Sequence, residues 1–261
     1  MKRRLVFFLL VFCCLHNAIS QSNNTFKKDH SADWQTLTGD YTTWSTYTYY
    51  NIHLSRDFIG LGLDSLDMDK PTFLHKLLTE PVFAFKIGTL GEKDVYKLYP
   101  LTSTDQSIIA VNREFASTAI RNYKTEGKEM PAFNFTDVNG NIYDNVSTKG
   151  KTLVLKCWFI HCVACVKEFP DLNKLVNKYK DNQNVLFISL AIDSEEALTT
   201  FLKSKKFKYA TVAKMKSFME NELNVTSYPT HLLIDSTGKI VKVVNRIEEL
   251  VPFLEAEVRG G

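Results

Sequence analysis

The stretch KCWFIHCVACVKEFP, Lys156 to Pro170, decides how the second half of this chain folds. Its two cysteines, Cys162 and Cys165, are separated by two residues. Residues 152–159, just before them, are almost all apolar, which is typical of a strand covered on both faces. Apolar residues then recur at helical spacing: Val163, Val166, Phe169, Leu172, Leu175, Val176 and Tyr179. The cysteine pair is therefore predicted to lie at a strand-to-helix junction.

The rest of the second half alternates strands and helices. A hairpin is predicted around Asn139-Gly140, because this dipeptide favours tight turns between strands. Further strands are predicted over 185–192, 209–212, 230–234 and 240–244, and helices over 195–203, 217–223 and 247–258. This order predicts an α/β fold, with a central mixed sheet flanked by helices. Cysteines at the carboxyl end of its central strand would lie where such sheets keep their sites.

The first half is harder to interpret. The stretch DYTTWSTYTYY, residues 40–50, is rich in threonine and aromatic residues and predicts a strand. A helix over 71–78, strands over 82–87 and 95–99 and an amphipathic helix over 108–123 follow. A break at TEGKEMP, residues 125–131, separates the halves. We therefore expect a smaller α+β region of unknown role over 21–126 and a second domain over 127–261.

The first twenty residues are typical of a secretory signal peptide. Three basic residues precede an apolar run from Leu5 to Leu15, and Ala18-Ile19-Ser20 offers a cleavage site. The mature protein is expected to be exported, with the periplasm as its location. An uncleaved anchor facing the periplasm is the alternative, although eleven apolar residues are too few to cross roughly 30 Å of hydrocarbon.

Charge and cysteine content narrow the function classes. Without Lys2, Arg3 and Arg4, 29 basic residues balance 29 acidic ones, so nucleic-acid binding is not indicated. Cleavage also removes two cysteines and leaves Cys157, Cys162 and Cys165. A protein stapled by disulfides would carry more cysteines, in an even number. A bridge closing so short a loop adds little stability and is better suited to redox cycling.

The predicted helix start gives the two cysteines different roles. Unpaired N–H groups and the helix dipole stabilise a thiolate, so the thiol pKa of Cys162 is expected below that of a free cysteine. Cys162 is therefore the candidate nucleophile. Cys165 lies one turn deeper and can approach it closely enough to form a disulfide. Cys165 would resolve a mixed disulfide and release the reduced substrate.

Three stretches of the second half carry a family resemblance. KCWFIHCVACVKEFP, TSYPTHLLID and MPAFNFTDVNGNIYDNVSTKGKTLVLKCWF resemble the TlpA/ResA group of thioredoxin-like thiol-disulfide oxidoreductases, from about Met130 onward. The resemblance implies a thioredoxin-like fold with a βα insertion. It implies reduction of disulfides in periplasmic proteins, with a membrane thiol reductase as electron donor. The redox-active disulfide would be the sole redox group, with no further cofactor and no metal.

The resemblance also assigns residues around the cysteines. Cys162 and Cys165 match the nucleophilic and resolving cysteines, and Glu168 matches the acid before the helix-kinking proline, Pro170. Pro229 matches the proline whose preceding peptide bond is cis in this family. The substrate-binding segment that this implies is Tyr228, Pro229 and Thr230, with the Tyr228 backbone pairing with an extended substrate.

Several positions depart from the family. Trp is usual where His161 stands, and Asn or Asp where Lys156 stands. His161 could be a cation that favours the thiolate or an inert residue facing solvent. For Lys156 we expect a stem that reaches outward to solvent, rather than a charge beneath the active site that alters the thiol pKa values. The expected neighbours of the active site are His161, Val163, Ala164, Trp158, Lys156 and Glu168.

Two alternative functions stay open. Cys157, predicted to be a buried hydrophobe, could join His161, Cys162, Cys165 and His231 as metal ligands, as in copper-delivery relatives of the fold. Those relatives have cysteines three residues apart, and structural zinc would require a second paired set. An oxidant that introduces disulfides is the other alternative, because the sequence does not reveal the reduction potential. The oligomeric state, the substrate and the electron donor are likewise not determined by the sequence.

Overall fold

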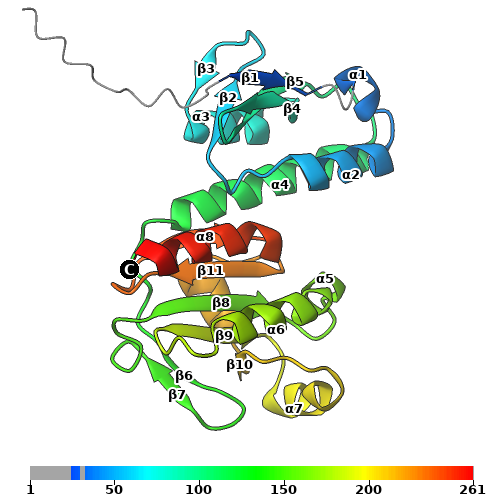
Figure 1. Ribbon diagram of the computed structural model, residues 1–261. Helices are drawn as coiled ribbons and strands as arrows, with labels where there is room; N and C mark the ends of the chain where they lie inside the picture. Colours follow the sequence, from blue (N-terminus) through cyan, green and yellow to red (C-terminus); the bar gives the residue numbers. More distant parts are fainter. Residues whose placement is uncertain (1–24, 30–32, 261) are drawn as a thin grey trace, which may run out of the picture.

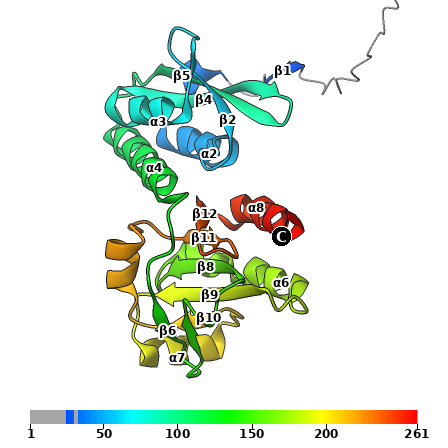
Figure 2. The ribbon, with the colours of Figure 1, turned by 90° about the vertical axis from the view of Figure 1, so that its left-hand side faces the viewer.

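The computed structural model describes residues 25–29 and 33–260, which form two regions. The long helix α4 (Gln106–Thr125) lies between them, with one sheet on each side, as Figures 1 and 2 show. The predicted signal peptide lies outside the described residues. Among the helices of the described ranges, none has both the length and the apolar character needed to cross a membrane.

The second region is built on a five-stranded mixed sheet in the order β10-β9-β8-β11-β12. Strands β8, β9 and β10 are parallel, whereas β11 is antiparallel to both β8 and β12. Their bounds are β8 (Thr152–Trp158), β9 (Val185–Ala191), β10 (Ala210–Val212), β11 (Thr230–Ile234) and β12 (Ile240–Val244). The predicted strands of this half are therefore confirmed, as is the α/β fold class.

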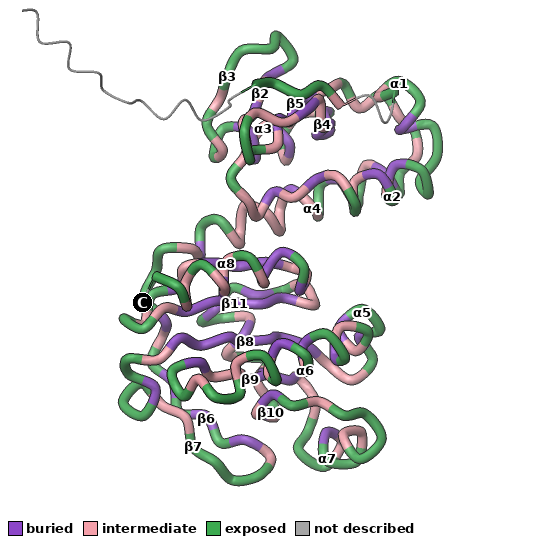
Figure 3. Tube along the Cα trace, viewed as in Figure 1, coloured by how far each residue is buried: buried purple, intermediate pink, exposed green. Residues whose placement is uncertain are grey.

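Helices cover this sheet because its central strand is apolar on both faces. All seven residues of β8 are buried, and Figure 3 shows the buried residues concentrated in β8 and β11. Trp158 packs on one face against Phe169, whereas Cys157 belongs to a separate core on the other face. Figure 2 shows α6 and α8 on the same side of the sheet. The helices are α5 (Val163–Lys167), α6 (Phe169–Lys178), α7 (Glu195–Ser204), α8 (Ile247–Gly260) and the short π-helix η1 (Phe218–Glu222).

The predicted hairpin precedes this sheet. Strands β6 (Asn134–Thr136) and β7 (Ile142–Asp144) pair antiparallel across a turn in which Gly140 has φ +85°. This left-handed conformation is favourable for glycine, which has no side chain to clash. The Asp137 carboxylate accepts backbone hydrogen bonds from Asn139 and Asn141 at 2.8 and 2.9 Å, which closes the turn.

The first region holds its own sheet, in the order β1-β4-β5-β2-β3. The predicted strands are β4 (Val82–Leu90) and β5 (Lys93–Pro100), and the predicted helices are α3 (Lys70–Thr79) and α4. Strands β1 (Phe26–Lys28), β2 (Phe58–Leu61) and β3 (Asp67–Met68) and helix α1 (Trp34–Leu37) were not predicted. Short edge elements of this kind carry little periodic signal.

The strand predicted over residues 40–50 is wrong, because this segment forms helix α2 (Tyr41–Asn51). The Asp40 carboxylate caps it by accepting a hydrogen bond from the Thr43 backbone N–H at 3.0 Å. Trp44 and Tyr47, three residues apart, are its buried residues. The Tyr47 ring stacks on Phe85, with the ring centres 5.3 Å apart. Capping and packing on the sheet outweigh the strand preference of threonine and aromatic residues.

Candidate active site

The two cysteines of the motif lie at the junction between β8 and α5, as predicted. The Cys162 backbone N–H donates to the Phe159 carbonyl at 3.1 Å, which turns the chain from strand to helix. Cys162 is the N-cap of α5, and its sulfur accepts a hydrogen bond from the Cys165 N–H at 3.2 Å. Cys162 and Cys165 form a disulfide, with their Cα atoms 5.2 Å apart.

The two sulfurs differ in access to solvent. Cys162 is 7% exposed, whereas Cys165 is completely buried. The neighbouring side chains on the outer side of this turn, His161, Val163 and Ala164, are all exposed. The His161 side chain faces solvent. Of the two cysteines, Cys162 is therefore the one with access to solvent.

The cis-proline loop lies beside this turn. The Tyr228-Pro229 peptide bond is cis, as expected. The loop leads into β11, where Thr230 is opposite Cys157 of β8, so the loop and the cysteine turn share one edge of the sheet. The Tyr228 ring packs edge-on against Phe159, with the ring centres 5.6 Å apart. Neither the N–H nor the C=O of the Tyr228 backbone makes a hydrogen bond to another residue of the described part of the chain.

Lys156 does not reach outward, and the expectation that it would is wrong. Its side chain is completely buried, and its ammonium Nζ lies 2.5 Å from Oε2 of Glu168. Glu168 lies at the turn between α5 and α6, directly after the helix that carries Cys165. This carboxylate provides the counter-charge that makes burial of the lysine tolerable.

Glu168 has two further partners. Nε2 of the buried His231 lies 3.0 Å from Oε2 of Glu168, and the Ile247 backbone N–H donates to Oε1 at 3.0 Å. Strand β8, strand β11 and the start of α8 thus converge on one carboxylate. The sequence indicates a role for His231 only as a possible metal ligand, because no sequence pattern pairs this histidine with Glu168. We call Lys156, Glu168 and His231 the buried triad.

The protonation states of the three side chains in the buried triad follow from their burial and from their contacts with one another. Burial acts to raise the pKa of Glu168, but contacts with His231 and Lys156 outweigh it and lower the pKa to about 2. Burial lowers the pKa of Lys156, and the Glu168 carboxylate partly offsets this effect. Burial and the Lys156 charge lower the pKa of His231. The consistent state is a Lys156–Glu168 ion pair with a neutral His231 donating its Nε2–H to the carboxylate.

Of the remaining motif residues, Trp158 packs in the same core as the cysteine pair and Cys157 in the other core. Trp158 is fully buried against Phe169, with the ring centres 5.0 Å apart. Cys157 is a free, buried thiol, and burial raises its pKa to about 12. Cys157 packs in one core and the disulfide in another, and no group of three or more His, Cys, Asp or Glu residues that could hold a metal ion occurs among the described residues.

Comparison with known proteins identifies the relatives of the second region. The Redoxin family model matches residues 125–255. The thiol-disulfide oxidoreductase ResA of Bacillus cereus is 34% identical over 119 residues, which are 45% of this chain and 68% of ResA. ResA of Bacillus subtilis is 32% identical over 123 residues, 46% of this chain and 67% of that protein. The solved thioredoxin domain of a thiol-disulfide oxidoreductase from Bacteroides vulgatus is 27% identical, with 50% of this chain and 96% of that one covered and a TM-score of 0.46.

The matched residues include both the cysteine turn and the cis-proline loop. The mixed sheet places these two segments at one edge, where a dithiol can exchange with a disulfide. The chain therefore belongs to the Redoxin family and is a thiol-disulfide oxidoreductase with a thioredoxin-like fold.

Proposed function

We propose that the protein reduces disulfide bonds of exported proteins, with Cys162 as the attacking cysteine and Cys165 as the resolving one. The observation that supports this assignment is the difference in exposure, because Cys162 is 7% exposed and Cys165 is completely buried. A thiolate at a helix start is stabilised by backbone N–H groups, which favours attack by Cys162.

The reaction is two successive exchanges. The Cys162 thiolate attacks one sulfur of the substrate disulfide, forms a mixed disulfide and releases the first substrate thiolate. The Cys165 thiolate then attacks Cys162 Sγ, which forms the Cys162–Cys165 disulfide and releases the second substrate thiolate. Two electrons pass from the dithiol to the substrate, whose two sulfurs each take up a proton.

The substrate would lie along the cis-proline loop. The free backbone N–H and C=O of Tyr228 support pairing with an extended segment, with Pro229 and Thr230 holding the loop in place. The basic and apolar start of the sequence, ending near Ser20, supports export, with the periplasm as the site of action. The disulfide would be returned to the dithiol by a membrane thiol reductase, and no other cofactor is required.

The reduction potential tests the direction of this reaction. Equilibrating the protein in graded dithiol buffers and trapping free thiols would give the potential of the Cys162–Cys165 couple. A value near −270 mV, roughly that of thioredoxin, is expected for a reductant. A value near roughly −120 mV would instead indicate an oxidant that introduces disulfides. The Cys165→Ala variant should retain its substrates as mixed disulfides on Cys162, and a Cys162→Ala variant is the matched control.

A further inference from the structure

A cavity lies between the two regions, beside the cis-proline loop. Its volume is about 430 Å³, which falls within the range of ligand-binding pockets. Helices α2 and α4 of the first region line one side, and Ser227, Tyr228 and Pro229 line the other. The substrate-pairing loop is therefore also a wall of this cavity.

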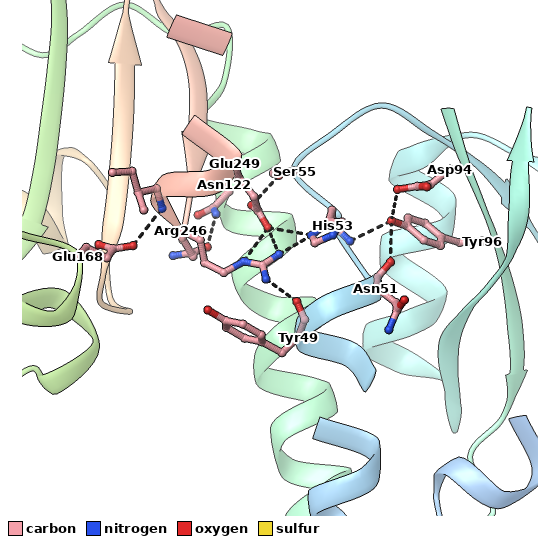
Figure 4. Close-up of polar contacts among 12 residues, drawn as sticks. Tyr49, Asn51, His53, Ser55, Asp94, Tyr96, Asn122, Glu168, Arg246 and Glu249 are labelled. Carbon is pink, nitrogen blue, oxygen red and sulfur yellow. Dashed lines mark hydrogen bonds and ion pairs between the residues drawn. The ribbon is translucent and has the colours of Figure 1, made fainter. Parts of the chain in front are cut away.

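Polar contacts hold the two walls together, as Figure 4 shows for part of the network. The Asn122 side-chain N–H of α4 donates to Oδ1 of Asn245 at 2.7 Å. Asn245 in turn donates to the Pro229 carbonyl at 3.0 Å. A chain of two hydrogen bonds thus joins the first region to the cis-proline loop. The cavity has a defined position relative to the cysteine turn because of this connection.

The walls favour an uncharged occupant. Every charged side chain that lines the cavity has a protein partner. Glu249 accepts a hydrogen bond from the Ser55 hydroxyl at 2.7 Å and is paired with Arg246. Lys70 donates to the carbonyls of Ser55 and Arg56. Glu114 pairs with Arg121, and Glu126 pairs with Lys242.

The rest of the lining is mainly aromatic and aliphatic, and part of it is open to solvent. Tyr49 is 51% exposed, Val111 40% and Tyr123 39%, although each is a large apolar side chain. Trp44, Ile52 and Phe115 also line the cavity. Exposed apolar side chains that surround a hollow mark a site for another apolar group.

We propose that this interdomain cavity binds an apolar side chain of the substrate protein, close in sequence to the substrate cysteine. The inference rests on the proposed function, because an extended segment that pairs with the Tyr228 backbone passes directly along the cavity wall. Alternate side chains of such a segment point to one side, where a hollow can receive them. The first region would thus select substrates by the residue flanking their disulfide.

Short peptides linked as symmetrical disulfide dimers test this inference. Two dimers would be compared, identical except that Phe or Ser flanks the cysteine, in versions that place this residue before or after it. The reduced protein is mixed with each dimer, and chromatography follows the release of peptide thiols. We expect the Phe peptide to react at least about tenfold faster, as the burial of an aromatic side chain implies. The small disulfide 2-hydroxyethyl disulfide serves to normalise every rate.

Three variants make the test specific. Thr48→Trp, on the lining of α2, should fill the cavity and bring the rate ratio of the two peptides close to one. Val111→Asp places a charge at the exposed rim without disturbing a core, and should lower the ratio as well. Thr46→Trp is the matched control, because Thr46 is exposed on the same helix and does not line the cavity. This control should retain the full ratio of the reduction rates for the Phe and Ser peptides.

The outcomes separate the two proposals. Equal rates for the Phe and Ser peptides, with 2-hydroxyethyl disulfide still reduced, would overturn the cavity assignment and leave the proposed function intact. A Phe preference that Thr48→Trp and Val111→Asp both leave unchanged would also overturn it. If neither the peptide dimers nor 2-hydroxyethyl disulfide is reduced, the proposed function and the cavity assignment are both overturned.

Discussion

Nζ of Lys156 lies 2.5 Å from Oε2 of Glu168, inside a domain whose sequence gives no direct sign of this pair. The lysine comes from the central strand and the glutamate from the helix turn that follows Cys165. His231, from the neighbouring strand, contacts the same carboxylate oxygen. A lone buried charge would be strongly unfavourable at this position, so each member of the buried triad depends on the others.

Lys156→Met should destabilise the protein by about 3 kcal/mol, because it leaves the Glu168 carboxylate buried without its cation. Urea unfolding measures this loss. The double variant Lys156→Met, Glu168→Leu removes both charges and should recover part of the lost stability. Lys174→Met is the control, because the Lys174–Asp171 pair is exposed and should contribute less than about 1 kcal/mol. A single variant as stable as the control would show that the pair contributes little.

Stability should fall as the pH is lowered from about 4.5 to 2. Contacts with His231 and Lys156 lower the pKa of Glu168 to about 2, despite burial. Hydrogen bonds from His53 and Ser55 and the charge of Arg246 lower the pKa of Glu249 to about 2 in the same way. Such carboxylates stabilise the folded state above the pKa of the unfolded chain, and this contribution is lost as they protonate.

Urea unfolding at a series of pH values measures this dependence. Glu168→Gln should flatten the decrease in unfolding free energy between about pH 4.5 and 2, by up to about 3 kcal/mol. Glu222→Gln, at an exposed position of the same region, should leave the decrease unchanged. An undiminished pH dependence in the Glu168 variant would contradict a lowered pKa for this group.

Alkylation of the reduced protein should distinguish the three cysteines of the second region, Cys157, Cys162 and Cys165. Iodoacetamide is expected to modify Cys162 first, because Cys162 retains some solvent exposure and lies at a helix start. Cys165 and Cys157 are completely buried, and burial raises the pKa of Cys157 to about 12. Peptide mass spectrometry after a short pulse should therefore find most of the label on Cys162. Denatured protein, labelled at all three positions, is the control, and faster native labelling of Cys165 would reverse the proposed roles.

Arg246→Ala should weaken the coupling between the two regions. Arg246 donates to the Tyr49 carbonyl of α2 and pairs with Glu249 of α8, which Figure 4 shows. Its loss leaves a buried carboxylate with fewer partners and should cost about 2 kcal/mol. Calorimetry should then resolve two unfolding transitions in place of one. Arg113→Ala, an exposed position on α4, is the control, and a single unshifted transition for Arg246→Ala would contradict the coupling.

The sequence alone determined the architecture of the second region. Apolar runs, helical spacing and turn residues are local signals, so β8, α4 and the hairpin around Gly140 were predicted close to their observed bounds. The cysteine turn was also predictable, because strand and helix patterns meet at Cys162. The cis bond before Pro229 followed from the family resemblance.

Only the tertiary structure decided the environment of these residues. Lys156, Glu168 and His231 are far apart in the sequence and meet because β8, β11 and the helix turn pack together. Helix α2 formed against the strand preference of its residues, because capping and packing on the first sheet lower its free energy. The cavity beside Pro229 likewise exists only where surfaces of the two regions meet. Such features depend on contacts between distant segments, which local sequence patterns do not encode.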